Sequence, residues 1–388
     1  MRLKPMPKAE YENRIKRLQG ELAANGIDVF IGYSSESESG TSRYLSGFWP
    51  FFDFVSIVVP VNGSPALVTG GPESYDFAKE FSAIENIFID PLFVESSAPE
   101  WVLKKPQQNL AKILGQVCST KPKKVGIANG NIFPYLIFNE LKEFAPDAEF
   151  VSADNLLLNV QSIKSDIEIP YIEKAYQITE EVMKYSIENV SAGKSEWEIS
   201  NGAFSKMLEL GAEGTPYPAW VCSGENTRLS LCRSTNKTIR ENELIQFTFG
   251  TKYMGVCGNM CRPLAIGKMP PQARELAAVA LEATANTIKA LKPGIKASDI
   301  FKIYYKLLSD YDLTENTLYG PAHGIGSSEV EGLWLSENAD FVIQPNMVLS
   351  IDIWLTKDSY GLRYEDGFLI TKTGLKELSG YKREIIEL

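Results

Sequence analysis

The sequence is poor in histidine, in long apolar runs and in positive charge. Its 388 residues include one histidine, His323, which excludes any metal site that needs two, such as a His-x-x-x-His zinc site. Lys and Arg total 39 against 49 Asp and Glu. The net charge of −10 has the wrong sign for binding a nucleic-acid backbone or an anionic membrane surface. We therefore expect no nucleic-acid partner and no membrane partner.

Membrane spans and disulfides are also not expected. No apolar run approaches the ~20 residues that cross a membrane. The first residues, MRLKPMPKAEYENRIKRLQ, turn amphipathic where a signal peptide would need an apolar stretch. The five cysteines are an odd number in a long chain, which favours reduced thiols over a disulfide scaffold. Together these absences predict a cytoplasmic protein.

The first 160 residues alternate between strand and helix patterns. Asn62-Gly63, between two apolar runs, predicts a β-hairpin. The expected strands are 27–31, 54–59, 66–69, 86–89 and 124–127, and the expected helices are 9–26, 107–117 and 135–144. The alternation predicts an α/β domain over residues 1–160. Because the chain is longer than the ~100–200 residues of one domain, a second domain is expected over 161–388.

The second domain contains long helical patterns and a short internal repeat. Helices are expected at 166–189 and, with Ser195 as N-cap, up to residue 210. The segment 190–199 (VSAGKSEWEI) is matched later by 291–300 (LKPGIKASDI), and each copy joins two helices through a glycine turn. Either the match arises by chance, or this region is an α+β unit of two similar halves with a site between them.

Six short motifs occur in order along almost the whole chain. They are RYLSGF (43–48), IKS (163–165), SGENT (223–227), FG (249–250), HGIG (323–326) and GLRYEDGFL (361–369). In this order they resemble the creatinase, aminopeptidase P and prolidase superfamily, metallopeptidase family M24. The resemblance implies an α+β fold, with a pita-bread C-terminal domain and a smaller α/β N-terminal domain. It also implies a homodimer in which one N-terminal domain reaches the partner's site.

Most metal ligands of that family are replaced in this chain. Family metallopeptidases hold two metal ions with Asp, Asp, His, Glu and Glu, and the resemblance maps these onto Thr248, Asn259, His323, Asp352 and Glu365. Two bridging carboxylates thus become neutral side chains, although hard divalent ions need anionic oxygen ligands. We therefore expect no cofactor. A single divalent ion at His323, Asp352 and Glu365 is the alternative.

Further departures separate the chain from both main branches of the family. A family histidine that follows the serine of SGENT by eight residues falls on Leu231, which argues against ordinary Xaa-Pro peptidase chemistry. Creatinases are the metal-free branch and use the histidine of HGIG as acid and base on a C–N bond. Their two creatine-binding arginines align with Asp53 and Ser336, which argues against creatine as the substrate.

Four residues are candidates for catalysis: His323, Glu365, Asp352 and Cys261. An imidazole titrates near neutrality and can move protons. Asp352 and Glu365 are 13 residues apart, which suits two strands of one hairpin that turns near 357–359. Two acids beside a histidine have pKa values that are pushed apart, so that one site supplies both acid and base. A structural pair between Arg363 and Glu365 is the alternative.

The thiols allow three interpretations. Cys257, Asn259 and Cys261 alternate along one expected strand and share a face. Cys261 is then a nucleophile activated by His323, or Cys257, Cys261, His323 and Glu365 bind zinc, or the thiols fill space left by lost metals.

Substrate binding is expected from a wider set: Arg363, Asn259, Thr248, Asp53, Phe51 and Cys257. Asp53 lies in the aromatic stretch FWPFFDF (48–54) and either faces a cationic group of a small-molecule substrate or is an exposed loop carboxylate. The main hypothesis is a creatinase-like hydrolase of a C–N bond in a small molecule, without a dinuclear metal centre. The alternatives are an inactive pita-bread protein that binds a peptide or protein, and an Xaa-Pro-type peptidase with a residual metal.

Overall fold

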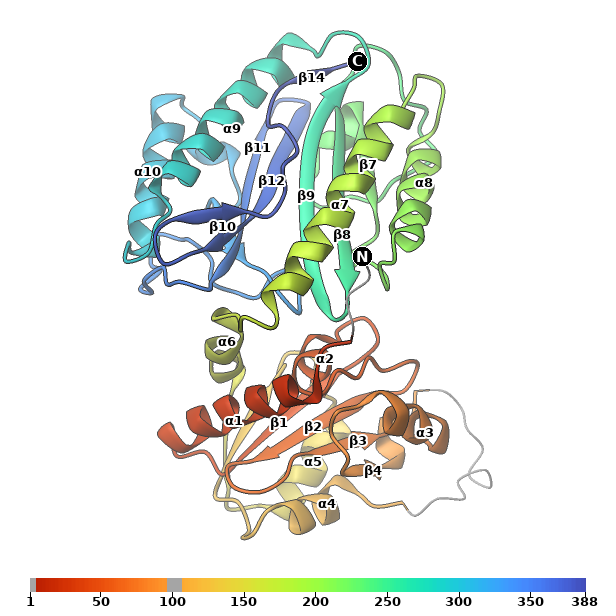
Figure 1. The fold of residues 1–388 in the computed structure, drawn as a ribbon, viewed down its shortest axis with the longest axis vertical. Helices are drawn as coiled ribbons and strands as arrows, with labels where there is room; N and C mark the ends of the chain where they lie inside the picture. The colour runs from red at the N-terminus through yellow and green to blue at the C-terminus, as the bar shows by residue number, and fades with distance from the viewer. Residues whose placement is uncertain (1–4, 96–106) are drawn as a thin grey trace. The chain divides into compact units, whose positions relative to one another are not determined.

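The computed structural model describes residues 5–95 and 107–388, and the chain forms two compact units (Figure 1). One unit spans Pro5–Gln161 and the other Ser162–Leu388. Each unit has its own buried apolar core. No helix among the described residues is long and apolar enough to cross a membrane.

The N-terminal unit is a six-stranded sheet in the order β4-β3-β2-β1-β5-β6 with helices on both faces. Its strands are β1 Val29–Ser34, β2 Val55–Pro60, β3 Ala66–Thr69, β4 Ile87–Ile89, β5 Lys124–Ala128 and β6 Glu149–Ser152. Its helices are α1 Lys8–Ala24, α2 Gly40–Ser46, α3 Pro72–Phe81, α4 Leu110–Val117, α5 Tyr135–Phe144 and α6 Asp154–Ser162, with a 3₁₀ turn at Pro91–Phe93. This is the α/β architecture that the alternating pattern predicts.

Two separate apolar clusters hold the helices to this sheet. Leu18 of α1, Tyr44 of α2 and Leu157 of α6 belong to the cluster on one face, and Ile113 of α4 and Leu141 of α5 to that on the other. The expected hairpin also forms, since β2 and β3 pair antiparallel. The central strands are buried on both faces, as a layer between helices must be.

The C-terminal unit is built on a mixed sheet whose main path is β10-β11-β12-β9-β8-β7. Its strands are β7 Trp220–Ser223, β8 Ile245–Tyr253, β9 Val256–Ala265, β10 Ala322–Gly324, β11 Val348–Lys357, β12 Tyr360–Ile370, β13 Leu375–Glu377 and β14 Ile386–Glu387. Its helices are α7 Ile169–Asn189, α8 Glu196–Glu209, α9 Pro271–Ala290 and α10 Ala297–Asp310, with 3₁₀ turns at Gly224–Arg228 and Thr314–Asn316. Helix α7 packs on β8 and β9, and α9 packs on β11 and β12 (Figure 1).

The two copies of the internal repeat form the same turn between two helices. Gly193 ends the α7–α8 turn with φ of +94° and Gly294 the α9–α10 turn with φ of +87°, a backbone region that favours glycine. The N–H of Gly193 donates to Ile239 O, and that of Gly294 donates to Ile343 O. Each helix pair is thus tied by the same bond to its own half of the unit, so the match between the two segments reflects structure.

Candidate functional site

The register of neighbouring strands brings the predicted catalytic residues together on the C-terminal sheet. Asp352 on β11 lies directly opposite Glu365 on β12, and Glu365 lies opposite Cys261 on β9. His323 on β10 pairs with Ser350, two residues before Asp352 on the same face of β11. The hairpin expected between Asp352 and Glu365 is therefore present.

His323 is held with its outer nitrogen towards two carboxylates. The side chain is buried, and Nδ1 donates to the carbonyl oxygen of Gly324 at 2.9 Å. Nε2 lies 3.7 Å from Glu365 Oε1 and 3.9 Å from Glu329 Oε1. The indole of Trp334 packs beside the imidazole, with ring centroids 4.9 Å apart. Burial alone would lower the pKa of His323, but the two carboxylates outweigh it and raise that pKa to about 9.

Glu365 is kept ionised by the groups around it. Ser350 Oγ donates to Glu365 Oε1 at 2.8 Å, and Cys261 Sγ donates to Glu365 Oε2 at 2.9 Å. Burial would raise the pKa of Glu365, but the imidazolium of His323, the guanidinium of Arg363 and the hydrogen bond from Cys261 lower it to about 2. Glu365 therefore serves as a fixed negative charge that holds a proton on His323.

Arg363 neutralises Asp352, not Glu365. Its Nε lies 3.1 Å from Asp352 Oδ1, and its Nη2 donates to the hydroxyl of Tyr319 at 2.5 Å. Aromatic rings surround the guanidinium, including those of Trp220 and Trp354 at 5.5 and 5.6 Å. Burial raises the pKa of Asp352 to about 6, while Arg363 opposes that rise. The suggested structural pair between Arg363 and Glu365 was wrong: these side chains share a face, but the guanidinium turns to the neighbouring strand.

Glu329 belongs to the cluster and was missed from the sequence. It lies in the loop after β10, and its Oε1 accepts from Asn259 Nδ2 at 3.1 Å. Its side chain is 32% exposed, so it links the buried groups to solvent. Burial and the nearby Glu365 raise the pKa of Glu329 to about 7. The available signal was the acidic pair Glu329 and Glu331 soon after HGIG.

A buried ion pair fixes the loop that carries Glu329. Lys164 Nζ pairs with Glu331 Oε2 in the interior, where both side chains are almost fully buried. Glu331 Oε1 also accepts from the backbone N–H and the hydroxyl of Ser327, at 2.5 and 2.9 Å. Lys164 belongs to the IKS motif, so this motif contributes to the site by holding the loop that carries Glu329 in place.

The thiols are not arranged for nucleophilic attack. Cys261 donates its proton to Glu365, and burial first, then the Glu365 charge, raises its pKa well above the usual thiol value. Burial likewise raises the pKa of Cys257 to about 12. A reactive thiolate needs a positive neighbour, whereas Cys261 faces a carboxylate, so the nucleophile hypothesis for Cys261 loses its physical basis. The predicted zinc set does not assemble either, since Cys257 Sγ contacts Ser327 O at 3.9 Å.

The remaining predicted binding residues fall into two groups. Thr248 on β8 and Asn259 on β9 are buried on the sheet of the C-terminal unit, with Thr248 opposite Cys261. Phe51 and Asp53 belong to the N-terminal unit and line a pocket there. Asp53 is not an exposed loop carboxylate, because it is 6% exposed and accepts from Ser74 Oγ at 2.6 Å. Substrate binding by these residues stays a prediction.

The residues present do not fit the two-metal centre that the resemblance implies. Thr248 and Asn259 bring no charge, and Asp352 is engaged by Arg363. Within residues 5–95 and 107–388, the potential ligand group is His323, Glu329 and Glu365, whose donor atoms all lie within 4.8 Å of one another. This set suits one ion at most. The expected residual set of His323, Asp352 and Glu365 stays a prediction, and the structure adds Glu329 to its candidates.

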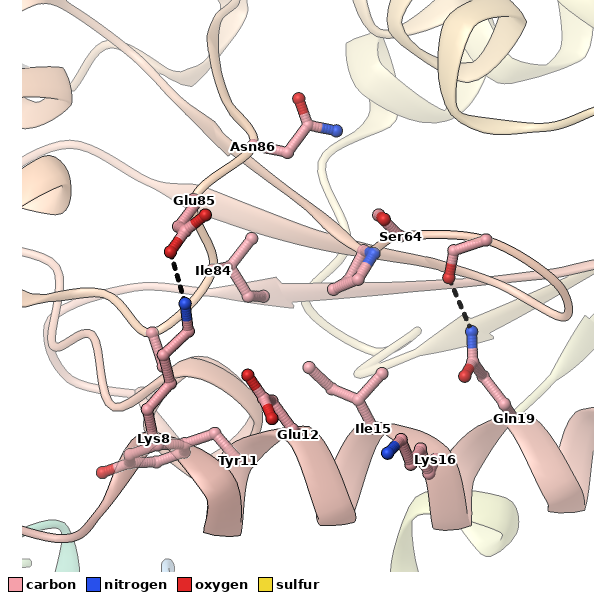
Figure 2. Close-up of a pocket in the computed structure, with 13 residues that line it drawn as sticks. Lys8, Tyr11, Glu12, Ile15, Lys16, Gln19, Ser64, Ile84, Glu85 and Asn86 are labelled. Carbon is pink, nitrogen blue, oxygen red and sulfur yellow. Dashed lines mark hydrogen bonds and ion pairs between the residues drawn. The ribbon is translucent and has the colours of Figure 1, made fainter.

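A second surface pocket of the N-terminal unit lacks such chemistry. It has a volume of about 380 Å³ and is lined by α1, the β2–β3 turn and the segment before β4 (Figure 2). Lys8 is paired with Glu85, and Gln19 donates to Gly63 O at 3.0 Å. No histidine or cysteine lines this pocket. The candidate functional site is therefore the cluster around His323.

Comparisons with known proteins identify the family. Residues 170–372 match the model of Metallopeptidase family M24, and residues 14–163 match the Creatinase/Prolidase N-terminal domain. The chain belongs to metallopeptidase family M24. Its C-terminal unit is a pita-bread domain and its N-terminal unit the smaller domain that precedes it, as the sequence motifs predict.

Several relatives of this chain carry peptidase names. An Xaa-Pro dipeptidase of Pyrococcus horikoshii is 28% identical over 342 residues, covering 86% of this chain and 91% of that protein. The crystal structure of the prolidase from Pyrococcus horikoshii OT3 superposes with a TM-score of 0.81 at 25% identity, covering 96% of this chain and 100% of that one. The X-Pro aminopeptidase from Thermotoga maritima gives 0.80 at 21% identity, covering 96% and 99%, and shows the fold alone.

Proposed function

We propose that this protein hydrolyses a C–N bond in a small molecule without a dinuclear metal centre, using His323 as the proton carrier. One observation carries the proposal. The only histidine of the chain presents Nε2 to Glu365 and Glu329 at 3.7 and 3.9 Å. The positive charges of this cluster come from side chains of the protein, the imidazolium of His323 and the guanidinium of Arg363. Family membership supports hydrolysis of a C–N bond as the reaction class.

Proton transfer in such a reaction needs only His323 and water. The neutral imidazole takes a proton from water at Nε2 as the water oxygen bonds to the substrate carbon, and the imidazolium then gives that proton to the leaving nitrogen as the C–N bond breaks. Glu365 stabilises the imidazolium formed between these two steps and stays ionised because its pKa is about 2. Asp352, fixed by Arg363, is placed to orient the substrate or the water.

The test combines metal analysis with a substrate screen. Purified protein, before and after incubation with Mn²⁺ and Zn²⁺ and again after chelation, is analysed for metal and assayed for amine release from small amides, amidines and ureas. We expect turnover that survives chelation and is lost in His323→Ala and His323→Gln, with Asn338→Ala, at an exposed position, as the control. Turnover that requires bound metal contradicts the proposal.

Two alternatives are separated by the same data. The His323, Glu329 and Glu365 group favours an Xaa-Pro-type peptidase with one divalent ion as the second candidate. That candidate requires about one equivalent of metal and cleavage of Xaa-Pro dipeptides. An absence of turnover in a correctly folded, metal-free protein favours a binding protein instead. A homodimer is part of the proposal, and light scattering after size-exclusion chromatography tests it.

A further inference from the structure

Two of the five cysteines are neighbours at the edge of the C-terminal sheet. Cys222 lies on β7 and is buried, and Cys232 lies in the loop after the SGENT motif and is partly exposed. Burial has the largest effect on the pKa of Cys222 and raises it, and the charge of Cys232 and a hydrogen bond to its thiol raise it further. A hydrogen bond between two thiols requires their sulfur atoms to lie side by side. The folded chain therefore already holds together the two partners that a disulfide needs.

The loop that carries Cys232 is tied to the strand that carries Cys222. The backbone N–H of Val221 donates to Ser234 Oγ at 2.8 Å, and the indole N–H of Trp197 on α8 donates to Ser234 O at 2.7 Å. The Cys232 thiol makes a weaker bond, in which Sγ donates to Arg233 O at 3.3 Å. Rotation of the Cys232 side chain can therefore bring the two sulfur atoms to bonding distance while β7 keeps its place.

The other three thiols have different neighbours. Cys261 donates to Glu365 Oε2 at 2.9 Å, and Cys257 Sγ contacts Ser327 O at 3.9 Å. Cys118 lies directly after α4 in the N-terminal unit and is partly exposed. These thiols serve as internal comparisons for the pair.

We propose that Cys222 and Cys232 form a reversible disulfide, which makes this loop a redox-sensitive modification site. The oxidant is a low-molecular-weight disulfide, with glutathione disulfide as the example. The more accessible thiol reacts first: the Cys232 thiolate bonds to one sulfur of the oxidant and releases one glutathione thiolate. The Cys222 sulfur then bonds to Cys232 and displaces the second glutathione. The two cysteines lose two electrons and two protons, and glutathione disulfide becomes two molecules of glutathione.

The bond would close a ring around residues 223–231, beside the catalytic cluster. This ring includes Ser230, whose carbonyl oxygen accepts from Arg363 Nη2 at 3.3 Å. Cys222 alternates with Trp220 along β7 and shares its face, and Trp220 flanks the same guanidinium at 5.5 Å. The oxidised form should therefore hold the loop more firmly next to Arg363. This inference goes beyond the proposed function and is independent of the reaction that the cluster performs.

Trypsin makes the bond directly identifiable, because cleavage after Arg228 and Arg233 separates the two cysteines into different peptides. The whole, folded and reduced protein is incubated with glutathione disulfide, its remaining thiols are blocked, and the digest is analysed by mass spectrometry without reduction. We expect peptide 207–228 linked to peptide 229–233 in more than about half of the molecules, and release of both by dithiothreitol. Hydrogen exchange of residues 229–233 should be at least about threefold slower in the oxidised protein, with the turn at 61–65 of the N-terminal unit unchanged.

Matched variants separate a built pair from general thiol oxidation. Cys232→Ser and Cys222→Ala should each abolish the linked peptide, and Cys118→Ser, at another partly exposed cysteine, should leave its yield unchanged. Circular dichroism shows whether each variant is folded, and Cys232→Ser tests the pair without altering a buried position. Glutathione that stays on Cys232 without linkage, linkage of Cys222 to a different cysteine, or linkage that forms only in urea-unfolded protein overturns the inference. Equal hydrogen exchange of residues 229–233 in the two forms overturns the effect on the loop.

Discussion

Asp352 and Arg363 form an ion pair across β11 and β12, with 3.1 Å between Oδ1 and Nε. In the family pattern the position of Asp352 belongs to a metal ligand, whereas here a guanidinium of the same chain balances its charge. Rings of Trp220, Tyr319 and Trp354 surround that guanidinium. The positive charge that balances Asp352 is therefore the buried guanidinium of Arg363.

Removing Arg363 should destabilise the protein strongly. Arg363→Met leaves Asp352 buried without a counter-charge, which costs about 3–5 kcal/mol of unfolding free energy. Urea denaturation measures the change, with Arg240→Met at an exposed position as the control. Adding Asp352→Asn to Arg363→Met should recover much of the loss. A loss below about 1 kcal/mol, the range of surface pairs, contradicts the role assigned to this pair.

The imidazole of His323 should titrate near pH 9 in the metal-free protein. Its folded pKa of about 9 lies above the ordinary value of 6.5. The stability this difference provides is therefore complete below pH 6.5 and is lost as the pH rises through 9. An NMR pH titration reads the single histidine directly, and Glu365→Gln should lower its pKa. A His323 pKa at or below 6.5 would show that the two carboxylates do not govern the imidazole.

Cys261 and Cys257 should be unreactive towards iodoacetamide at neutral pH. Both thiols are fully buried and their pKa values are raised by burial, so the thiolate is scarce. Mass spectrometry of the alkylated native protein measures each site, with the partly exposed Cys232 as the reactive comparison. Cys261→Ser should keep at least half of the activity. Rapid alkylation of Cys261 with loss of turnover would restore the nucleophile hypothesis.

Reintroducing the two missing carboxylates should create a metal site. Thr248→Asp with Asn259→Asp adds two charges close to Glu329 and Glu365, so the metal-free variant should unfold at a lower temperature because like charges repel. Mn²⁺ should raise its melting temperature and bind at least tenfold more tightly than to the parent protein, measured by calorimetry. The exposed pair Thr238→Asp with Asn236→Asp is the control. Equal Mn²⁺ binding by parent and variant contradicts the account of why the dinuclear centre is absent.

The sequence predicted much of the local structure because the deciding interactions are short in range. Ser195 caps α8 and its hydroxyl accepts from the N–H of Glu198, a bond between residues three positions apart. Helices α1, α5 and α7 begin and end within three residues of the expected limits. The short helix α2 was not predicted as a helix, although it carries the RYLSGF motif. It is a buried two-turn element, too short for its periodicity to stand out.

The sequence by itself determined the family, the single histidine and the loss of two bridging carboxylates, because these depend on residue identity and on motif order. Only the tertiary structure decided which charges meet. In the folded chain Arg363 pairs with Asp352, and Cys261 donates to Glu365. Glu329 lies beside His323 because the buried pair of Lys164 and Glu331 fixes its loop. Such partners come from loops and neighbouring strands far apart in the chain. Electrostatic energy depends on distance and burial, which sequence spacing does not provide.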